Sequence, residues 1–391
     1  MTQSQQDRPI WIISGTRPEV IKLAPVLRSL QQRFGDNAVH WISTGQHMQL
    51  ESETLALFGI TPHHRLPRRP EDKHIVDFDA HLIEGLTQLM RAEQPRLVVV
   101  QGDTASTFSG AFAGFHEGIP VCHVEAGLRS DSIQDPFPEE SYRRMTDAMT
   151  VLHFAPSALA VQNLQSEGYP ADTIYCTGNT SIDALGMVDE LEARASPDDP
   201  PLPPLAVDRR LIMATVHRRE SWGAPMQAIC LAIRDIVRRY DDVEVILPMH
   251  VNPKVRSTLM GVLEDEPRVH LTEPMAFARF HSVMRRAYLI LSDSGGISEE
   301  APSYEVPTLI LRNTTERPEA IKAGLAHLAG TDRAAVFAAA SRILDDPREH
   351  EAMRGAQNPY GDGRAAERIA LGIGRYLDGQ QPALTEAEQF C

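Results

Sequence analysis

The sequence predicts an α/β protein made of two doubly wound, Rossmann-like domains that face each other across a cleft. Short apolar runs alternate with longer segments of helical periodicity, which is the pattern of parallel βαβ units. The alternation starts at residue 10 and starts again at residue 209. Between the two series, residues 196–204 are rich in proline and support neither a helix nor a central strand.

Length and composition agree with two domains. The chain has 391 residues, of which 42% are hydrophobic and 23% charged, which is enough apolar material for two separate cores. We expect an N-terminal domain over residues 1–190, a linker over 191–204 and a C-terminal domain over 205–362. A helix over 365–376 and a loosely ordered tail are expected within residues 363–391.

The expected strands are short apolar runs, taken in chain order. In the first domain they cover residues 10–13, 39–42, 97–100 and 121–124. In the second domain they cover residues 209–215, 243–247, 269–271, 289–291 and 308–311. Because ligands of open parallel sheets bind beyond the carboxyl ends of the strands, the loops that follow these runs are where functional residues are expected.

Charge and hydropathy exclude several classes of partner. The formal net charge is −15, so the phosphates of a nucleic acid would on average be repelled, and nucleic acid is not an expected partner. The N-terminus is polar, and no uninterrupted apolar run approaches the roughly 18 residues of a membrane span. We therefore expect a cytoplasmic protein that neither is secreted nor crosses a membrane.

The four cysteines, Cys122, Cys176, Cys230 and Cys391, are far apart in the sequence. Their spacing is typical of neither a zinc site nor a disulfide framework. The sequence therefore predicts reduced thiols and no metal.

Residues 289–300 contain the strongest candidate for a ligand site. An apolar strand runs into Ser294, Gly295 and Gly296, which open a helix, and such a turn aims backbone N–H groups at an anion while glycine allows close approach. Glu300 lies one helical turn beyond Gly296, where its carboxylate could accept both hydroxyls of a ribose. These features favour a nucleotide diphosphate. The alternative is an ordinary strand-to-helix turn with solvated glutamates.

Charged residues also follow the strands of the first domain. Arg17 lies just ahead of a helix N-terminus, and Lys22 lies five residues further on, although an ordinary solvated lysine is the favoured alternative there. Asp103 and Glu125 follow the third and fourth strands, where a carboxylate needs a cation or a role in proton transfer. Glu139 and its neighbour Glu140 start a later helix, and one of the pair is expected only to favour the helix N-terminus.

In the second domain, His217 and Arg218 follow the first strand, and imidazole is the side chain best suited to proton transfer near neutral pH. His250 follows the next strand, and Arg317 follows a later one. Phe280 could stack on a nucleobase, although a core position is the favoured alternative for an aromatic residue on a helix.

Taken in order, these motifs resemble those of the non-hydrolysing UDP-N-acetylglucosamine 2-epimerases, a family similar in fold to the nucleotide-sugar glycosyltransferases of the GT-B type. The resemblance covers nearly the whole chain. It rests on residues 15–19, 44–47, 102–104, 123–129, 138–140, 177–180, 217–220, 293–300, 314–319 and 358–363.

The resemblance implies reversible inversion at C2 of UDP-GlcNAc to give UDP-ManNAc, without a metal or another cofactor. UDP would be eliminated to leave bound 2-acetamidoglucal and would then add back on the other face. By motif position, the catalytic residues would be Asp103, Glu125, Glu139 and His217. The substrate-binding residues would be Arg17, Lys22, Phe280, Ser294, Gly295, Gly296, Glu300 and Arg317. Which carboxylate takes the C2 proton stays open.

The sequence departs from the family pattern at several positions. Tyr142, Ser221 and Ser298 each replace a residue with a side-chain amide, and Met48 replaces an arginine associated with activation by a second substrate molecule. The possible allosteric positions that remain are Gln46, Gln49, Arg218 and His250. Allosteric activation is therefore in doubt, and the departures also allow a modified sugar or slow turnover.

Four functions remain in competition. An epimerase leads, and a hydrolysing variant that releases ManNAc and UDP is the runner-up. A GT-B glycosyltransferase fits the carboxylate trio less well, and a catalytically silent UDP-sugar sensor would bind without turnover. The expected partners are a UDP-sugar substrate and, from the resemblance, a second copy in a homodimer.

Overall fold

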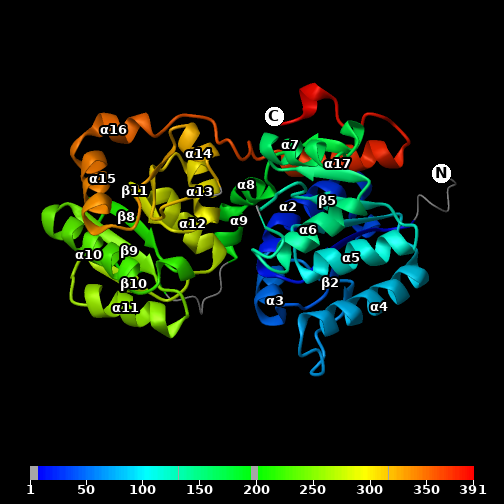
Figure 1. Cartoon of the computed structure of the whole chain (residues 1–391), viewed down its shortest axis with the longest axis horizontal. Helices are drawn as coiled ribbons and strands as arrows, with labels where there is room; N and C mark the ends of the chain where they lie inside the picture. Colours follow the sequence, from blue (N-terminus) through cyan, green and yellow to red (C-terminus); the bar gives the residue numbers. More distant parts are fainter. Residues whose placement is uncertain (1–7, 131, 195–200, 316) are drawn as a thin grey trace. The chain divides into compact units, whose positions relative to one another are not determined.

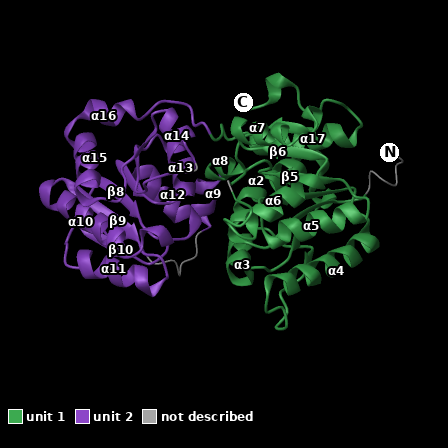
Figure 2. Cartoon of the chain, in the orientation of Figure 1, with its two compact units in different colours: residues 1–186, 360–391 green, residues 187–359 purple. Residues whose placement is uncertain are grey.

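The computed structural model describes residues 8–130, 132–194, 201–315 and 317–391, and the chain divides into two compact units. Unit 1 comprises Met1–Gly186 and Tyr360–Cys391, and unit 2 comprises Met187–Pro359 (Figure 2). Much of the expected linker, residues 195–200, lies outside the described residues. The C-terminal segment returns to unit 1, so this unit is built from two separate stretches of the chain.

Unit 1 contains a parallel seven-stranded sheet in the order β3-β2-β1-β4-β5-β6-β7. Ile10 of β1 pairs with Val39 on one side and Leu97 on the other, so the strand order reverses between β1 and β4. Such a reversal is where ligands bind in doubly wound sheets. The strands are β1 (Ile10–Ser14), β2 (Val39–Ser43), β3 (His64–Arg65), β4 (Leu97–Gln101), β5 (Val121–Val124), β6 (Leu152–Ala155) and β7 (Ile174–Cys176).

Helices cover both faces of the unit 1 sheet (Figure 1). On one face α4 packs on α5 and α5 packs on α6, while α2 packs with α8 and α17. Helix α4 illustrates why these helices pack on the sheet. Its apolar residues Phe78, Leu82 and Leu86 recur every fourth residue and form one buried stripe on the helix surface. The helices are α2 (Arg17–Phe34), α3 (Met48–Leu57), α4 (Ile75–Glu93), α5 (Ala105–His116), α6 (Glu139–Ala148), α7 (Ala158–Ser166), α8 (Thr180–Leu185) and α17 (Ala365–Leu377), with short 3-10 turns η1 (Asp36–Ala38), η2 (Ala171–Thr173) and η5 (Glu386–Glu388).

Unit 2 contains a parallel six-stranded sheet in the order β10-β9-β8-β11-β12-β13. Alternate residues of β8 enter two different cores: Ile212 packs with the α10 side and Met213 with the α12 side. The strands are β8 (Arg210–Thr215), β9 (Val243–Pro248), β10 (Val269–Thr272), β11 (Leu289–Ser292), β12 (Thr308–Ile310) and β13 (Ala326–Leu328). The helices are α9 (Val188–Ala193), α10 (Ala224–Arg239), α11 (Pro253–Leu263), α12 (Phe277–Arg286), α13 (Gly295–Glu300), α14 (Glu319–Lys322), α15 (Arg333–Asp345) and α16 (Pro347–Ala352), with 3-10 turns η3 (Arg219–Ser221) and η4 (Ala301–Tyr304).

The doubly wound α/β class is confirmed, and every expected strand is present. The strands that were not expected are β3, β6, β7 and β13, which have two to four residues each. In the described residues, no helix combines the length and the apolar character that crossing a bilayer requires.

The segment after Gly379 is packed against unit 1 rather than loosely ordered. Ala383 and Leu384 are buried, and the backbone N–H of Ala383 donates to the Tyr175 hydroxyl at 3.0 Å. Arg375 holds Glu388 through two hydrogen bonds of 2.5 and 2.7 Å. The tail is therefore ordered by apolar burial and by a bidentate ion pair.

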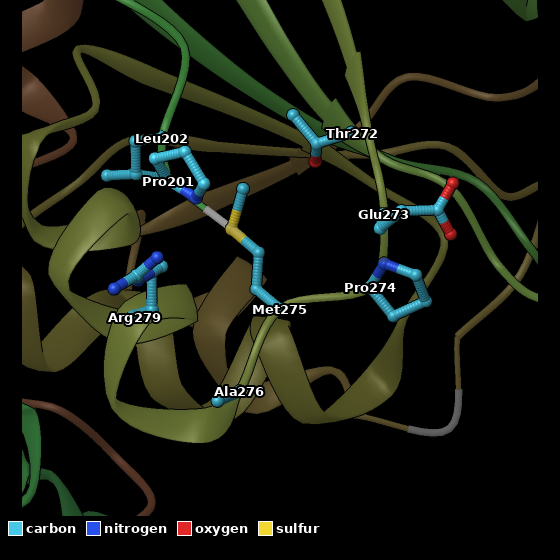
Figure 3. Close-up of a pocket in the computed structure, with 8 residues that line it drawn as sticks. All are labelled: Pro201, Leu202, Thr272, Glu273, Pro274, Met275, Ala276 and Arg279. Atoms are coloured by element: carbon cyan, nitrogen blue, oxygen red, sulfur yellow. The ribbon is translucent and has the colours of Figure 1, made fainter. Parts of the chain in front are cut away.

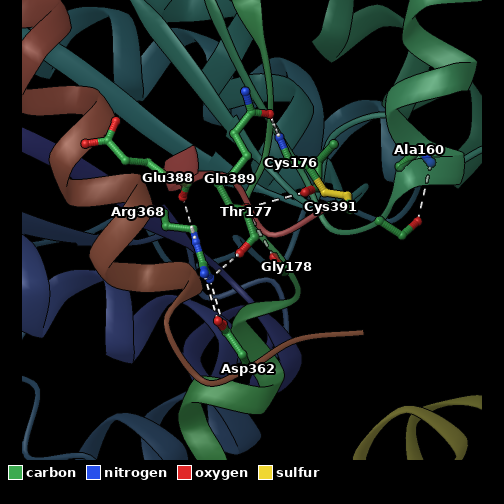
Figure 4. The surroundings of a disulfide bond; sticks show 11 residues. Ala160, Cys176, Thr177, Gly178, Asp362, Arg368, Glu388, Gln389 and Cys391 are labelled. Carbon is green, nitrogen blue, oxygen red and sulfur yellow. Dashed lines mark hydrogen bonds and ion pairs between the residues drawn. A yellow bond between two sulfur atoms is a disulfide. The ribbon is translucent and has the colours of Figure 1, made fainter. Parts of the chain in front are cut away.

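The expectation of four reduced thiols is wrong for two of them, because Cys176 and Cys391 form a disulfide (Figure 4). Their Cα atoms lie 5.8 Å apart although 215 positions separate them in the sequence. The tail runs beside the end of β7, where Phe390 N–H donates to the Cys176 carbonyl at 2.8 Å. Sequence spacing carries no trace of this pairing, since the fold brings the two cysteines together. Cys122 and Cys230 are free and buried.

Candidate functional site

The loops after β1, β4 and β5 bring several of the predicted residues of unit 1 together. Glu125, directly after β5, has a left-handed backbone with φ of 69°, a conformation that is strained for a residue with a Cβ. Its Oε2 atom lies 2.5 Å from Lys22 Nζ and also accepts a hydrogen bond from the Gln101 amide. Lys22 is therefore not a solvated surface lysine: its side chain is 19% exposed and reaches back to the strand edge.

Asp103, after β4, pairs with an arginine that the sequence analysis missed. Arg143 Nη2 lies 2.5 Å from Asp103 Oδ2, and Arg143 Nη1 lies 3.0 Å from Glu140. Arg143 lies three residues after Glu140 on α6, and this spacing places the two side chains on one helix face. The spacing could therefore have indicated the ion pair between Arg143 and Glu140. The ion pair fixes the Asp103 carboxylate relative to α6.

The two glutamates that start α6 have different surroundings. Glu140 is fully buried and accepts hydrogen bonds from Ser130 N–H at 3.0 Å and Arg144 Nε at 2.8 Å. Burial acts to raise the pKa of Glu140, but these hydrogen bonds and Arg143 outweigh it and hold the pKa below its ordinary value. Glu139 is half-buried. Glu140 is thus held in place by these contacts, whereas Glu139 is the more exposed member of the pair.

A buried histidine supports the loop that carries Asp103. His123 Nδ1 lies 2.6 Å from Asp147 Oδ1, and its Nε2 lies 2.8 Å from the carbonyl oxygen of Gly102. Arg129 pairs with the same aspartate at 2.7 Å. This network holds the carbonyl immediately before Asp103 in place.

In unit 2, two arginines converge on the start of α13. A Cβ placed on Gly295 would lie only 2.7 Å from Arg317 Nη1 and 3.3 Å from Arg218 Nη2, so both guanidinium groups lie directly beside this glycine. Arg317 Nε is held by Glu299. Two guanidinium groups over the first residue of a helix form a local concentration of positive charge that suits a diphosphate.

Glu300 occupies the position that its spacing predicted. A Cβ placed on Gly296 would lie 4.0 Å from Glu300 Oε1, so the carboxylate faces the glycine one turn earlier. His281 Nε2 lies 3.7 Å from Glu300 Oε2. Ser294 is the N-cap of α13, and its carbonyl accepts the Ser298 hydroxyl at 3.2 Å. Gly295, Gly296 and Glu300 therefore form one local arrangement with the arginines.

His217 is oriented by Asp293, to which the sequence analysis gave no role. The buried Asp293 carboxylate accepts the backbone N–H groups of His217 and Arg218, each at 2.9 Å, and lies 3.5 Å from His217 Nδ1. Burial lowers the pKa of His217. The Asp293 carboxylate acts to raise this pKa, and the charges of His250 and Arg218 lower it further. The net shift favours a neutral imidazole near pH 7, which can accept a proton.

Phe280 lies on α12, is half-buried and packs against the apolar cluster that contains Met284 and Ile297. Its ring meets His281 edge to face at 5.7 Å. A nearby hollow after β10 has a volume of only about 20 Å³, roughly the room that one water needs (Figure 3). It is lined by Pro201, Leu202, Thr272, Glu273, Pro274, Met275, Ala276 and Arg279. None of these is a predicted site residue, and the hollow is too small for a nucleotide.

The three side chains that replace amides of the family pattern are all buried in this chain. Tyr142 donates to buried Asp79 at 2.5 Å and stacks on Phe108 at 5.1 Å. Ser298 is buried on α13. Ser221 is also buried, and its hydroxyl has no hydrogen-bond partner among the described residues. At position 142, the aromatic ring of Tyr142 stands where the family pattern has a side-chain amide, and this ring belongs to the hydrophobic core of unit 1.

The possible allosteric residues are divided between the units. In unit 1, Gln46 accepts the Ser106 hydroxyl at 3.0 Å, while Gln49 is exposed and donates to Glu53 at 3.0 Å. In unit 2, Arg218 lies beside Gly295, and the exposed His250 stacks on His217 with ring centroids 5.7 Å apart. Each unit therefore contributes two of these side chains.

Two Rossmann-like units with charged residues at their strand ends place the chain in the GT-B class of α/β proteins. A family model described as UDP-N-acetylglucosamine 2-epimerase matches residues 30–373, and the chain belongs to this family. The UDP-N-acetylglucosamine 2-epimerase of Bacillus subtilis is 42% identical over 360 residues, which is 92% of this chain and 93% of that protein.

Solved structures agree with this assignment. A crystal structure from Listeria monocytogenes has a TM-score of 0.89 and 38% identity, and it covers 98% of this chain and 100% of its own. The UDP-GlcNAc 2-epimerase of Neisseria meningitidis, bound to UDP-GlcNAc, has a TM-score of 0.82 and 35% identity over 95% of this chain and 100% of its own.

Proposed function

We propose that this protein is an isomerase that interconverts UDP-GlcNAc and UDP-ManNAc by elimination and re-addition of UDP. One observation supports this most directly: Arg317 and Arg218 flank Gly295 at the start of α13, and Glu300 lies one turn beyond. This arrangement offers cations to a diphosphate and a carboxylate to a ribose. The Neisseria meningitidis relative, which binds UDP-GlcNAc, supports the same ligand.

In the proposed elimination, the C2 proton passes to a base of the protein while the C1–O bond breaks, and UDP leaves with the bonding electrons. Asp103, Glu125 and Glu139 are the candidate bases or acids from unit 1. Lys22 contacts Glu125 directly, and Arg143 contacts Asp103, so two of these three carboxylates lie next to a cationic side chain.

The departing diphosphate gains negative charge, which Arg317 and Arg218 would stabilise together with Arg17. His217, oriented by Asp293 and neutral near pH 7, would exchange a proton with the reacting sugar or with the leaving group. Re-addition of UDP to the other face of the glucal, with a proton returned to C2, gives the epimer. Closure around the intermediate would keep water from trapping it.

The experiment is proton NMR of UDP-GlcNAc with the protein in deuterated water. We expect deuterium at C2 of both UDP-GlcNAc and UDP-ManNAc, because the proton removed from C2 exchanges with solvent before UDP adds back. A matched variant, Asp103→Asn, should slow the exchange by about 100-fold or more if this carboxylate handles a proton. The folded wild-type protein leaving C2 unlabelled would contradict the proposal.

The same spectra separate the alternatives. A hydrolysing variant would accumulate free ManNAc and UDP, a glycosyltransferase would leave UDP-GlcNAc unchanged until an acceptor was added, and a sensor would shift its resonances without turnover. We also propose, from the family resemblance, that the active form is a cytoplasmic homodimer. Light scattering at working concentration would test the dimer.

A further inference from the structure

Glu19 is a buried carboxylate that the proposed function does not use. It lies on the first turn of α2 and is 1% exposed. Its Oε2 atom accepts the Gly15 backbone N–H at 3.0 Å and the Thr16 hydroxyl at 2.8 Å. Its Oε1 atom accepts the Thr104 hydroxyl at 2.7 Å. Among the described residues, no basic side chain forms an ion pair with Glu19, so these neutral donors alone compensate its burial.

The donors come from two different loops. Gly15 and Thr16 follow β1, and Thr104 follows β4, which is the point where the strand order reverses. Arg17 is the next residue after Thr16, and Asp103 is the residue directly before Thr104. One carboxylate therefore connects the backbone neighbours of a proposed substrate-binding arginine and of a proposed acid or base.

We propose that Glu19 is a positioning residue that sets the geometry of Arg17 relative to Asp103 by joining the loops after β1 and β4. The inference rests on the proposed function, because these two side chains must act on one substrate for their relative placement to matter. Glu19 itself does not touch the substrate.

The bridge requires an acceptor on each side of the carboxyl group. In Glu19→Gln one oxygen becomes an NH₂ group, which cannot accept, so the link to Thr104 or the link to Gly15 and Thr16 is lost while the shape is kept. The Thr107 hydroxyl also lies 3.1 Å from Oε1, but its hydrogen has a shorter path of 2.6 Å to the Gln101 carbonyl. Thr104 is thus the main donor from the β4 loop.

The test is a double-mutant cycle on UDP-GlcNAc epimerisation. Glu19→Gln should lower kcat by about tenfold or more with KM changed less than about threefold, since misplaced reacting groups slow the chemical step more than binding. Thr104→Val should act similarly. The double variant should be no slower than the slower single variant, because both substitutions break the same link. Thr104→Ser keeps the hydroxyl and should restore kcat.

A matched control separates positioning from folding. Asp183 is another largely buried carboxylate of unit 1, and it accepts the N–H groups of Ala365 and Ala366 at 3.2 and 2.7 Å. Asp183→Asn should lower the melting temperature but leave kcat within about twofold of wild type. If wild type shows no turnover, the proposed function fails and the inference falls with it. If wild type turns over but folded Glu19→Gln keeps the wild-type kcat, only the positioning role is refuted. The same holds if the reductions in kcat from Glu19→Gln and Thr104→Val multiply in the double variant.

Discussion

At the scale of the residue, the raised pKa of Glu19 leads to a prediction about stability. Burial raises this pKa from 4.5 to about 7. The hydrogen bonds from Thr104, Thr16 and Gly15 act to lower the pKa, and the charge of Glu51 adds a small further rise. Between pH 4.5 and 7 the folded chain keeps a proton that the unfolded chain has released. Stability therefore falls as pH rises through this window and is lower above it.

We expect Glu19→Gln to remove this part of the pH dependence, which amounts to about 3 kcal/mol. Urea unfolding of wild type and variant at pH 5 and pH 8 would measure it. Wild type should lose more stability than the variant between these two values. Equal losses in the two proteins would mean that Glu19 ionises normally.

A second prediction at the scale of the residue concerns Gly295 and the affinity for UDP. Because a Cβ there would meet Arg317 Nη1 at 2.7 Å, Gly295→Ala should push the guanidinium aside and occupy the space of a phosphate. We expect the Kd of UDP to rise by about tenfold or more, measured by titration calorimetry. The control is Gly261→Ala on α11, where nothing lies within 4 Å of the added methyl group. That change should stabilise the helix by about 0.5–1 kcal/mol without affecting UDP. Unchanged UDP affinity in Gly295→Ala would show that the diphosphate binds elsewhere.

At the scale of the element, the disulfide between β7 and the tail should stabilise unit 1. It closes a loop across 215 positions, and such cross-links contribute about 2–4 kcal/mol by restricting the unfolded chain. Cys391→Ser should therefore melt at a lower temperature than wild type in calorimetry without reductant. With reductant present the two proteins should melt together. A difference that persists in reductant would assign the effect to packing of the tail instead.

The elements also show what sequence patterns can and cannot predict. The turn at Ser294–Gly296 was recognisable because glycine and a strand-to-helix change are local signals. Arg143 and Asp293 were missed because their partners, Asp103 and His217, lie 40 and 76 positions away and meet them only through the fold. Lys22 was misjudged for the same reason, since its contact with Glu125 depends on the neighbouring strands β1, β4 and β5.

At the scale of the whole molecule, the two parallel sheets followed from the repeated alternation of apolar runs and helices. The division of the chain did not follow, because the expected linker, residues 191–204, lies within unit 2, whereas the chain crosses between units after Gly186 and again after Pro359. The second crossing, at Pro359 and Tyr360, has no low-complexity signal. Residues 360–391 join unit 1 because α17 packs on α2 and α8.

The disulfide has one further consequence for this chain path. Cys176 belongs to the first stretch of unit 1 and Cys391 to the second, so the bridge closes a covalent ring that contains all of unit 2. A protease that nicks any single peptide bond within the ring leaves one molecule rather than two. The fragments would separate on a denaturing gel only after a reductant has opened the bridge.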